Sequence, residues 1–433
     1  MVSLRPISQT GLPPDWPYTG FDTNLPIAER EEVMYKGQKV LLTHAWCRIS
    51  YSVLRGLTSQ GIKVVVADTG KLGMCQASRL PYAKEVYRSL YSDPIGFIDD
   101  VDALCTYHDI GLIIPGHEEG ELLAKAKESG RFASGATLAL VDSKTLGMAN
   151  DKDHMSRLAK ELGVSVAPIV DYHTSDEVKD ITDPKKWYVA RARYGNSSKG
   201  VRFSRGGESL GNEVKKMMVD FHLESDRLPI IQEFVEGCGW GVSCLYWHGQ
   251  RIGCFTHRRL QEKIATGGPS TLRMAASNPA LEADAHRLLS ALNWHGLAMV
   301  EFKQDDKRRD HYFVEINPRL WGSIDLSLSS GVNFPWLLYL SELYGSDVAL
   351  SAFQGAREGI VERWIWGGVL RRLDLMRRGR LVDALSLRDG FHADSFDDFK
   401  LDDPFVFLGE VFYYFNKLYK TRSINPIEVG MVR

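Results

Sequence analysis

The sequence has few of the features that mark a secreted, a membrane-spanning or a nucleic-acid-binding protein. Its six cysteines contain no C-x-x-C pair, which argues against a zinc site and predicts buried thiols in a reducing compartment. The formal net charge of −2 gives no general attraction to nucleic acid. No apolar run has membrane-spanning length, and the first 37 residues lack the apolar core of a signal sequence. We therefore expect a cytoplasmic protein.

The length and composition are those of an ordinary globular protein. With 433 residues, 44% of them apolar and 25% charged, the chain is long enough for two or three domains. Between residues 39 and 68, two β-branched runs flank a helical stretch, which predicts a β-α-β unit and a parallel sheet. The turn after the first run has no G-x-G-x-x-G, so a dinucleotide-binding fold is disfavoured, although Asp68 ends the second run.

A later strand-like run ends at Pro115 and leads into a helical stretch. In an open α/β sheet, the carboxyl ends of the strands line the ligand crevice. His44, Glu118 and Glu119 are therefore candidates for holding a substrate. For the two glutamates, the alternative is stabilisation of the first helical turn.

Residues 297–322 contain two strand-like runs joined by a charged connection, which predicts an antiparallel hairpin with Glu301 near Glu315. Asn317 projects on the same side as Glu315, because side chains alternate along a strand. Two carboxylates and an amide oxygen suit Mg²⁺ when phosphates complete its shell, and Arg319 can reach such phosphates. The alternative is an exposed hairpin with solvated glutamates, but both lie in apolar runs, where burial is costly without a cation.

The run VEINPR in this hairpin resembles the E-x-N-x-R metal-binding motif of the ATP-grasp superfamily. Upstream, residues 142–170 predict a helix that ends near Gly163, containing a D-K dipeptide followed by E-L-G-V-x-x-A-P. This pattern resembles the start of the first ATP-grasp subdomain, in which the lysine contacts ATP phosphates. The resemblance gives that role to Lys152.

The next segment, WYVARARYGNSSKGV, predicts a strand that runs into a loop with Gly195, Asn196, Ser197, Ser198 and Gly200. Small residues let such a loop close over phosphate, and its position resembles the ATP-grasp glycine-rich loop. Arg191 stands where the superfamily usually has a lysine. Carbamoyl-phosphate synthetase also uses an arginine at this position. The charge is kept, and Arg193 is a second candidate for the same contact.

The resemblance places the adenine at a short linker between two strands. The matching positions are Gln232, Glu233, Phe234 and Val235. Many relatives bind the ribose with a glutamate where this chain has Gly239, so we expect Glu236 to take that role.

A basic cluster follows, with Arg258, Arg259 and Lys263 ahead of the paired Gly267 and Gly268. In relatives, this region contributes a cation to the triphosphate and a mobile loop to the acceptor substrate. The alternative interpretation is a charged helix face with a turn.

After Gly345 the resemblance becomes weaker. The remaining segments are amphipathic, with aromatic and basic residues towards the C-terminus. Packing against the rest of the protein is the simpler interpretation, and peripheral contact with an anionic membrane is the alternative.

We therefore expect a mixed α/β and α+β protein. Its predicted parts are an N-terminal extension (1–38), a parallel-sheet pre-ATP-grasp domain (39–140), a two-lobed ATP-grasp domain (141–345) and a C-terminal helical, aromatic extension (346–433).

The resemblance implies a ligase that uses ATP and Mg²⁺ or Mn²⁺ to join a small-molecule carboxylate to an amine through an acylphosphate, releasing ADP and phosphate. Arg319, Arg258 and Arg259 are the expected catalytic cations, and a homodimer is compatible with this interpretation. Two alternatives stay open: phosphoryl transfer to a small carboxylate, as in carbamoyl-phosphate synthetase, and a non-catalytic nucleotide-binding module.

Overall fold

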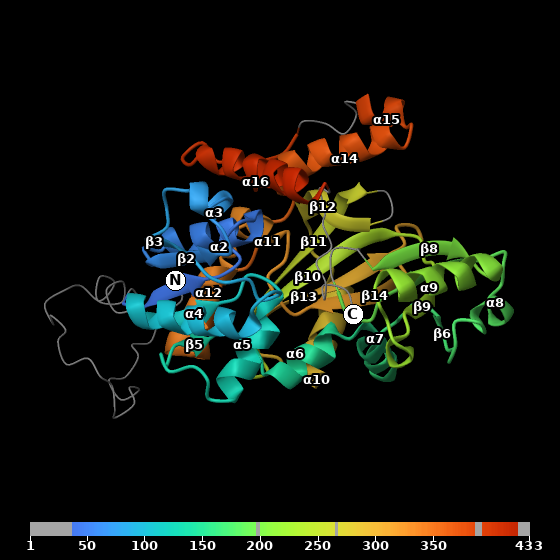
Figure 1. The fold of residues 1–433 in the computed structure, drawn as a ribbon, viewed down its shortest axis with the longest axis horizontal. Coiled ribbons are helices and arrows are strands. Elements are labelled where there is room, and N and C mark those ends of the chain that lie inside the picture. Colours follow the sequence, from blue (N-terminus) through green and yellow to red (C-terminus); the bar gives the residue numbers. More distant parts are fainter. Residues whose placement is uncertain (1–36, 196–199, 265–266, 386–391, 423–433) are drawn as a thin grey trace, which may run out of the picture. The chain divides into compact units, whose positions relative to one another are not determined.

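A computed structural model describes residues 37–195, 200–264, 267–385 and 392–422. The predicted N-terminal extension lies almost entirely outside these ranges, as do Asn196, Ser197 and Ser198 of the predicted loop. The described chain contains three β-sheets with helices on their faces (Figure 1). This confirms the predicted mixed α/β and α+β class.

The first sheet is parallel and has five strands in the order β3-β2-β1-β4-β5. Its strands are β1 (Lys39–Leu42), β2 (Val64–Asp68), β3 (Ala83–Val86), β4 (Ile110–Ile114) and β5 (Thr137–Leu138). The helices between them are α2 (Arg48–Thr58), α3 (Met74–Ala77), α4 (Pro94–His108) and α5 (Glu119–Glu128). Strand β2 is buried along its whole length, as expected for a parallel sheet covered on both faces. The predicted β-α-β unit and parallel sheet are confirmed.

The expected single helix after residue 142 is two helices, α6 (Ser143–Asn150) and α7 (Lys152–Glu161). Asp151 separates them with an extended ψ of 105°, and its carboxylate accepts hydrogen bonds from the N–H groups of Asp153 and His154. Such an N-cap satisfies the unpaired donors of the helix start. It also fixes Lys152 at the first position of α7.

The smallest sheet has four strands in the order β6-β9-β7-β8 and its own core. Its elements are β6 (Ile169–Val170), α8 (Val178–Ile181), β7 (Trp187–Arg191), β8 (Val201–Arg205), α9 (Glu208–Asp220), the 3₁₀ turn η1 (Ser225–Arg227) and β9 (Ile230–Glu233). Leu210, Val214 and Met217 of α9 pack on Ile231. The sheet thus has a hydrophobic core of its own, and the division of residues 141–345 into two lobes stays a prediction.

The largest sheet has seven strands in the order β14-β13-β10-β11-β12-β15-β16. Its first five strands are β10 (Cys238–Trp247), β11 (Gln250–Ile264), β12 (Gly267–Ala275), β13 (Gly296–Gln304) and β14 (His311–Asn317). Helices α10 (Pro279–Ala291), α11 (Ile324–Ser329), α12 (Phe334–Tyr344) and α13 (Ser346–Ala352) connect or follow them. The basic segment expected to be a mobile loop or a helix face is therefore an antiparallel strand pair, β11 and β12.

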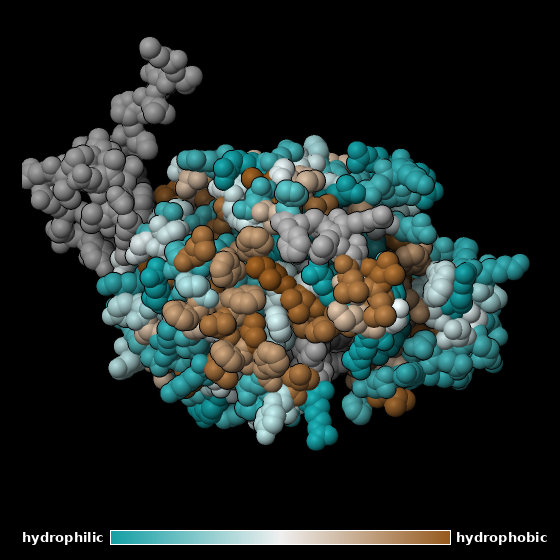
Figure 2. All heavy atoms as spheres, turned by 90° about the horizontal axis from the view of Figure 1, so that it is seen from above, coloured by the Kyte–Doolittle hydropathy of each residue, from teal (hydrophilic) through white to brown (hydrophobic). Residues whose placement is uncertain are grey.

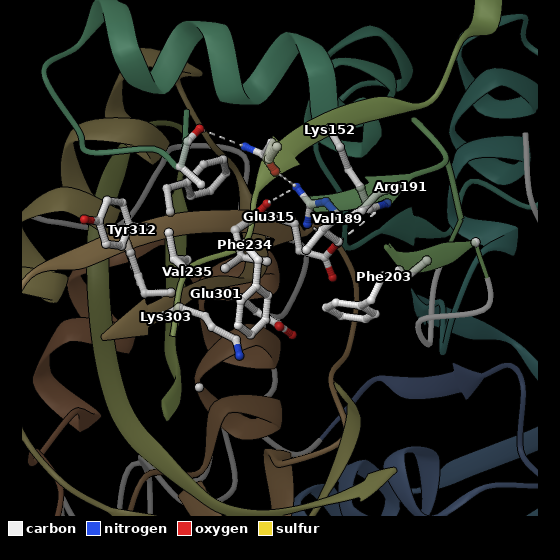
Figure 3. Close-up of a pocket in the computed structure, with 18 of the residues that line it drawn as sticks. Lys152, Val189, Arg191, Phe203, Phe234, Val235, Glu301, Lys303, Tyr312 and Glu315 are labelled. Atoms are coloured by element: carbon white, nitrogen blue, oxygen red, sulfur yellow. Dashed lines mark hydrogen bonds and ion pairs between the residues drawn. The ribbon is translucent and has the colours of Figure 1, made fainter. Parts of the chain in front are cut away.

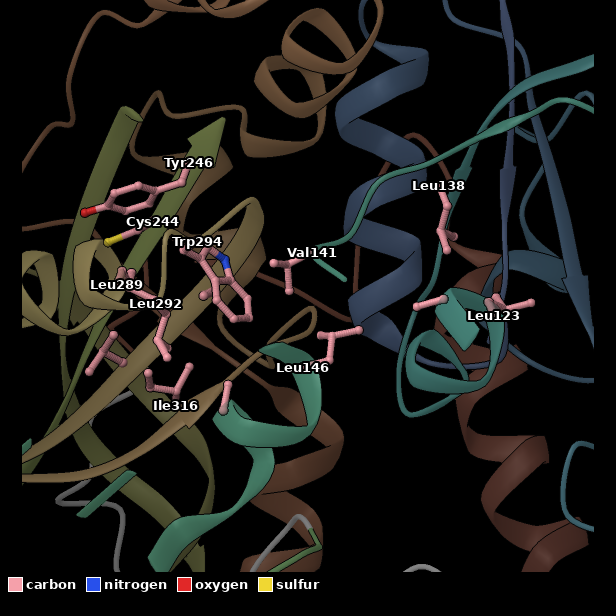
Figure 4. Close-up of a cluster of buried hydrophobic side chains, with 14 of the residues drawn as sticks. Leu123, Leu138, Val141, Leu146, Cys244, Tyr246, Leu289, Leu292, Trp294 and Ile316 are labelled. Atoms are coloured by element: carbon pink, nitrogen blue, oxygen red, sulfur yellow. The ribbon is translucent and has the colours of Figure 1, made fainter. Parts of the chain in front are cut away.

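One hydrophobic core joins the first sheet to the largest one (Figure 4). Leu138 of β5 and Leu146 of α6 belong to the same buried cluster as Tyr246 of β10 and Trp294. The joint core places the carboxyl ends of the parallel strands beside the hairpin β13–β14.

The C-terminal residues add the strands β15 (Val361–Arg363) and β16 (Ser395–Phe396) to the largest sheet, and the helices α14 (Ile365–Arg377), α15 (Leu381–Leu385) and α16 (Phe405–Thr421) (Figure 1). Helix α14 packs on β11 and β12, and α16 packs on α3, which confirms the predicted packing of this region. The boundaries at residues 140 and 345 stay predictions. No described helix is long and apolar enough to cross a membrane.

A buried ionic cluster ties the last strands to the sheet. The Arg273 guanidinium of β12 is fully buried and forms ion pairs with Glu362 of β15 and Asp397, which also pairs with Arg48. Breaking a buried pair leaves an uncompensated charge, which costs more than the intact pair contributes.

We expect Arg273→Met to lower the free energy of unfolding by about 3–5 kcal/mol, because it removes the cation that pairs with the buried Glu362 and leaves Asp397 only its ion pair with Arg48. Urea denaturation followed by circular dichroism measures this. The matched control is Arg131→Met, which removes an ion pair with Asp99 whose two side chains are 40% and 52% exposed, and it should cost at most about 1 kcal/mol. Equal losses for the two variants would contradict the assigned role of Arg273.

Candidate active site

Glu301 and Glu315 lie directly opposite each other on β13 and β14. The Asn317 amide donates a hydrogen bond to Glu301 Oε1 (2.9 Å), and its oxygen accepts one from Arg319 (2.9 Å). The predicted hairpin and the proximity of these four residues are confirmed. No group of three or more His, Cys, Asp or Glu in the described ranges could hold a metal. A metal here would depend on the two carboxylates, the amide oxygen and a ligand brought by a substrate.

Three further cations surround the carboxylate pair. Lys152 Nζ lies 3.6 Å and Arg191 Nη1 3.9 Å from Glu315 Oε2. Arg259 Nη2 lies 2.5 Å from Glu301 Oε1. With Arg319, four cations face the two carboxylates of this pair, and Glu262 adds a third carboxylate 3.7 Å from Arg259. The site therefore carries surplus positive charge that a polyanion would neutralise.

Burial and these charges shift the titration of the site. Burial lowers the pKa of Lys152, although Glu315 opposes the shift. Burial alone would raise the pKa of Glu315, but Lys152, Arg191 and Arg319 lower it. Burial raises the pKa of Glu301 against the opposing charge of Arg259, and the charge of Glu315 adds to that rise. Glu315 is therefore the carboxylate that stays ionised most firmly.

A cavity of about 170 Å³ lies between the four-stranded sheet and the hairpin (Figure 3). Its wall is mostly apolar and aromatic, with Val189, Phe203, Phe234 and Phe313. Gly200 of the predicted loop lines this cavity. So do all four residues of the predicted linker, Gln232, Glu233, Phe234 and Val235. Lys152, Arg191 and Glu315 stand at one end. The cavity therefore joins an apolar chamber to the charged cluster.

Arg191 is held firmly in this cavity. It donates hydrogen bonds to Gln232 Oε1 (3.0 Å) and to the Val314 carbonyl (3.0 Å). Arg193, the second candidate, pairs instead with Asp151 and lines a different cavity. The geometry therefore brings Arg191, and not Arg193, to the apolar chamber.

Two more cavities meet the charged cluster. One of about 460 Å³ is mostly polar, and one of about 140 Å³ lies beside Met299 and Trp321. Glu315, Asn317 and Arg319 line both. Because Glu315 also lines the apolar chamber, all three cavities converge on it.

Two residues predicted to hold a substrate have structural partners instead. Glu119 is buried and accepts hydrogen bonds from Thr43 Oγ1 (2.5 Å) and from the Gly116 N–H (2.9 Å), so it holds the turn after β4. The His44 ring accepts a hydrogen bond from Trp46 Nε1 (3.0 Å) and stacks on His117. Of the three predicted residues, only Glu118 lines one of the three cavities described above, the polar one.

His117 was missed by the sequence analysis. Its ring lies 4.7 Å from the His44 ring, and it lines both the polar and the 140 Å³ cavity. A lone histidine in a loop has no spacing pattern, so the only available signal was its place after the strand end at Pro115.

The basic cluster divides between the two faces of β11. Arg259 faces the carboxylates, whereas Arg258 forms an ion pair with Asp306 (2.7 Å). Lys263 Nζ lies 5.9 Å from the centre of the Trp364 ring. Arg258 and Lys263 line none of the three cavities, so their contact with phosphates stays a prediction that these cavities do not support.

The remaining predicted positions differ in whether they line the cavities. Gly268 lines the apolar and the 140 Å³ cavity. Glu236 is exposed and is not among the residues that line the apolar chamber, so its ribose role stays a prediction. Glu262 and Lys303 line that chamber and were missed, although Glu262 lies within the predicted basic cluster and Lys303 within the predicted hairpin.

Comparisons with known proteins agree with this architecture. A family model described as "ATP-grasp in the biosynthetic pathway with Ter operon" matches residues 226–362. The pyruvate carboxylase of Pichia angusta is 24% identical over 243 residues, which are 52% of this chain and 20% of that protein. The enzyme of Aspergillus niger is 26% identical over 243 residues, 52% of this chain and 19% of that protein. The chain thus spans about a fifth of the length of these relatives.

Solved structures show the same fold at low sequence identity. Biotin carboxylase from Campylobacter jejuni has a TM-score of 0.58 and 15% identity, over 74% of this chain and 72% of that chain. L-amino acid ligase from Bacillus licheniformis has a TM-score of 0.57 and 16% identity, over 75% of this chain and 79% of that chain. N5-carboxyaminoimidazole synthetase from Staphylococcus aureus has a TM-score of 0.56 and 15% identity, over 72% of this chain and 78% of that chain. The chain has the ATP-grasp fold.

Proposed function

We propose that this ATP-grasp protein binds ATP between its two lobes and uses it, with Mg²⁺, to join a carboxylate to an amine. The observation that carries the proposal is the convergence of three cavities on a buried cluster of four cations and two carboxylates. Such a cluster suits phosphoryl transfer, where catalysis consists mainly of positioning and of stabilising negative charge.

The apolar chamber would hold the nucleoside. Its aromatic wall, with Phe203 and Phe234, suits a flat purine ring. The linker N–H groups of Glu233 and Phe234 donate to the carbonyls of Pro168 and Trp187. We therefore assign the hydrogen bond to the adenine edge to the Val235 N–H. The triphosphate would then extend towards Lys152 and Arg191.

Glu301, Glu315 and Asn317 have the donor set that suits Mg²⁺, since hard oxygen ligands are completed by substrate phosphates. The biotin carboxylase domain of the 2-oxoglutarate carboxylase from Hydrogenobacter thermophilus has been solved with MgADP. When bound, the metal would neutralise phosphate charge. The protein's own cations, Lys152 and Arg191, would orient the phosphate oxygens.

The two polar cavities would hold the other substrates. The 140 Å³ cavity, beside Arg319 and Arg259, suits a carboxylate. An oxygen of this carboxylate attacks the γ-phosphorus of ATP and ADP leaves, which gives an acylphosphate. An amine in the 460 Å³ cavity then attacks the acyl carbon, loses a proton and expels inorganic phosphate. We place the amine there because this cavity shares Glu315, Asn317 and Arg319 with the smaller one.

A phosphate-release screen of acids and amines with Mg-ATP tests the proposal. An active pair should form an amide, ADP and phosphate, and ¹⁸O from the labelled acid should enter the phosphate. Release of AMP and pyrophosphate would refute the acylphosphate route. ADP formed without ¹⁸O in phosphate would indicate uncoupled hydrolysis.

A second candidate is phosphoryl transfer to a small carboxylate such as bicarbonate. It is favoured by the small volume of the carboxylate cavity and by the similarity to pyruvate carboxylases. ADP release that depends on bicarbonate and needs no added amine would select this candidate.

A further inference from the structure

Helix α16 carries an exposed apolar stripe along its whole length. Its members are spaced alternately three and four residues apart and are Phe405, Leu408, Phe412, Phe415 and Tyr419. The opposite side is buried through Val406, Gly409 and Glu410. The helix is therefore anchored to the protein by one side and presents a continuous apolar stripe on the other.

Helices α14 and α15 extend this apolar surface. Their exposed side chains are Val369, Leu373, Met376, Leu381, Val382 and Leu385. Together, α14–α16 and Leu401 contribute more than half of the exposed large apolar side chains of the described chain. The view from above shows apolar side chains gathered on this face (Figure 2). We call this face, formed by α14, α15, Leu401 and α16, the C-terminal face. Its apolar side chains form a patch of the kind that marks an interaction site.

The same three helices are basic, although the whole chain has a formal charge of −2. Residues 365–385 hold five arginines and two aspartates. Helix α16 and the residue after it add Lys417, Lys420 and Arg422, while its only acidic residue, Glu410, is buried. Ion pairs with Asp374 and Asp383 engage Arg378 and Arg380. The charge of the C-terminal face is thus opposite to that of the chain as a whole.

We propose that the C-terminal face binds the surface of an anionic lipid membrane. Apolar and aromatic side chains flanked by lysine and arginine are the pattern by which amphipathic helices lie in the headgroup region. The aromatic Tyr419 is followed directly by Lys420, an arrangement suited to the boundary between acyl chains and headgroups. Each basic residue near an anionic surface adds to the attraction.

Two observations favour a membrane over a second copy of this chain. In a two-fold dimer, the same face meets itself, so the basic helices would repel each other across the contact. The apolar side chains also protrude strongly, since Leu401 and Tyr419 are each 88% exposed and Val382 is 85% exposed. A fluid headgroup layer can accommodate protruding side chains, whereas a second protein surface would need complementary pockets for them.

Co-sedimentation of the full chain with vesicles tests the proposal. We expect binding to phosphatidylcholine vesicles that contain phosphatidylglycerol, weak binding to phosphatidylcholine alone, and loss of binding as salt is raised. The double variant Phe412→Ser, Phe415→Ser should weaken binding by about tenfold for each phenylalanine. Lys420→Gln with Arg377→Gln should weaken binding to the anionic vesicles only.

The matched control is Tyr107→Ser with Val219→Ser, which removes apolar side chains that are 81% and 73% exposed elsewhere and should leave binding unchanged. Absence of binding to anionic vesicles would overturn the proposal. It would also be overturned if light scattering showed a dimer that the Phe412→Ser, Phe415→Ser variant dissociates, since a second copy would then cover the face. Circular dichroism confirms that the variants fold.

Discussion

The Glu315→Gln variant is expected to lose about 10²–10³-fold in kcat for ATP-dependent phosphate release while it keeps its fold. Glu315 lines all three cavities and faces Lys152 and Arg191. The amide keeps the shape of the side chain but removes the negative charge that would hold Mg²⁺ against these cations. Phosphate release gives the rate, and circular dichroism gives the fold.

Glu236→Gln is the matched control, because Glu236 is exposed and outside the chamber. Its activity should equal that of the unchanged protein. Full activity in the Glu315→Gln variant would contradict the metal assignment. A similar loss in both variants would show that the assay reports something other than this site.

Arg191→Met is expected to raise the KM for ATP by about 10–150-fold, which corresponds to the 1.5–3 kcal/mol of a hydrogen bond to a charged group. Arg191 is buried and is oriented by Gln232 and the Val314 carbonyl, so little movement is needed for it to meet a phosphate. Arg191→Lys keeps the charge and should restore most of the affinity, since the superfamily usually has lysine at this position.

Arg258→Met is the control for Arg191→Met. Arg258 lies on the face of β11 that pairs with Asp306, so its removal should leave the KM for ATP unchanged. An unchanged KM in Arg191→Met, or an equal rise in both variants, would remove the phosphate role from Arg191.

The central hairpin could be predicted because its information is local. Each strand is a short, β-rich apolar run, and the charged connection between the two runs predicts their antiparallel pairing. The facing of Glu301 and Glu315 then follows from the register. The order of the surrounding motifs identified the ATP-grasp fold, although each motif alone is weak.

The division of the basic cluster between two faces of β11 was not predicted, because its segment was not recognised as a strand. Along a strand, neighbouring side chains face opposite sides, so Arg258 and Arg259 cannot both face the carboxylates. Register irregularities between Arg259 and Ile264 then break the alternation, and Lys263 reaches Trp364 instead of the cavity. Bulges of this kind depend on the paired strand and have no clear signal in one sequence.

Long-range partners explain the other differences. Glu119 was a plausible crevice residue until Thr43, far away in the sequence, proved to be its partner. The strands β15 and β16 are too short to give a periodic pattern, and they join the sheet through the buried pairing of Arg273 with Glu362 and Asp397.

Calorimetric titration of the protein with the ATP analogue AMP-PNP, in the presence of Mg²⁺ and again in the presence of EDTA, tests the central claim most directly. The account predicts binding to one site, strongly weakened by EDTA and by Arg191→Met, and a Mg²⁺ dependence that is lost when Glu301 and Glu315 are both replaced by glutamine. Absence of binding, or binding that neither EDTA nor these substitutions change, would contradict it.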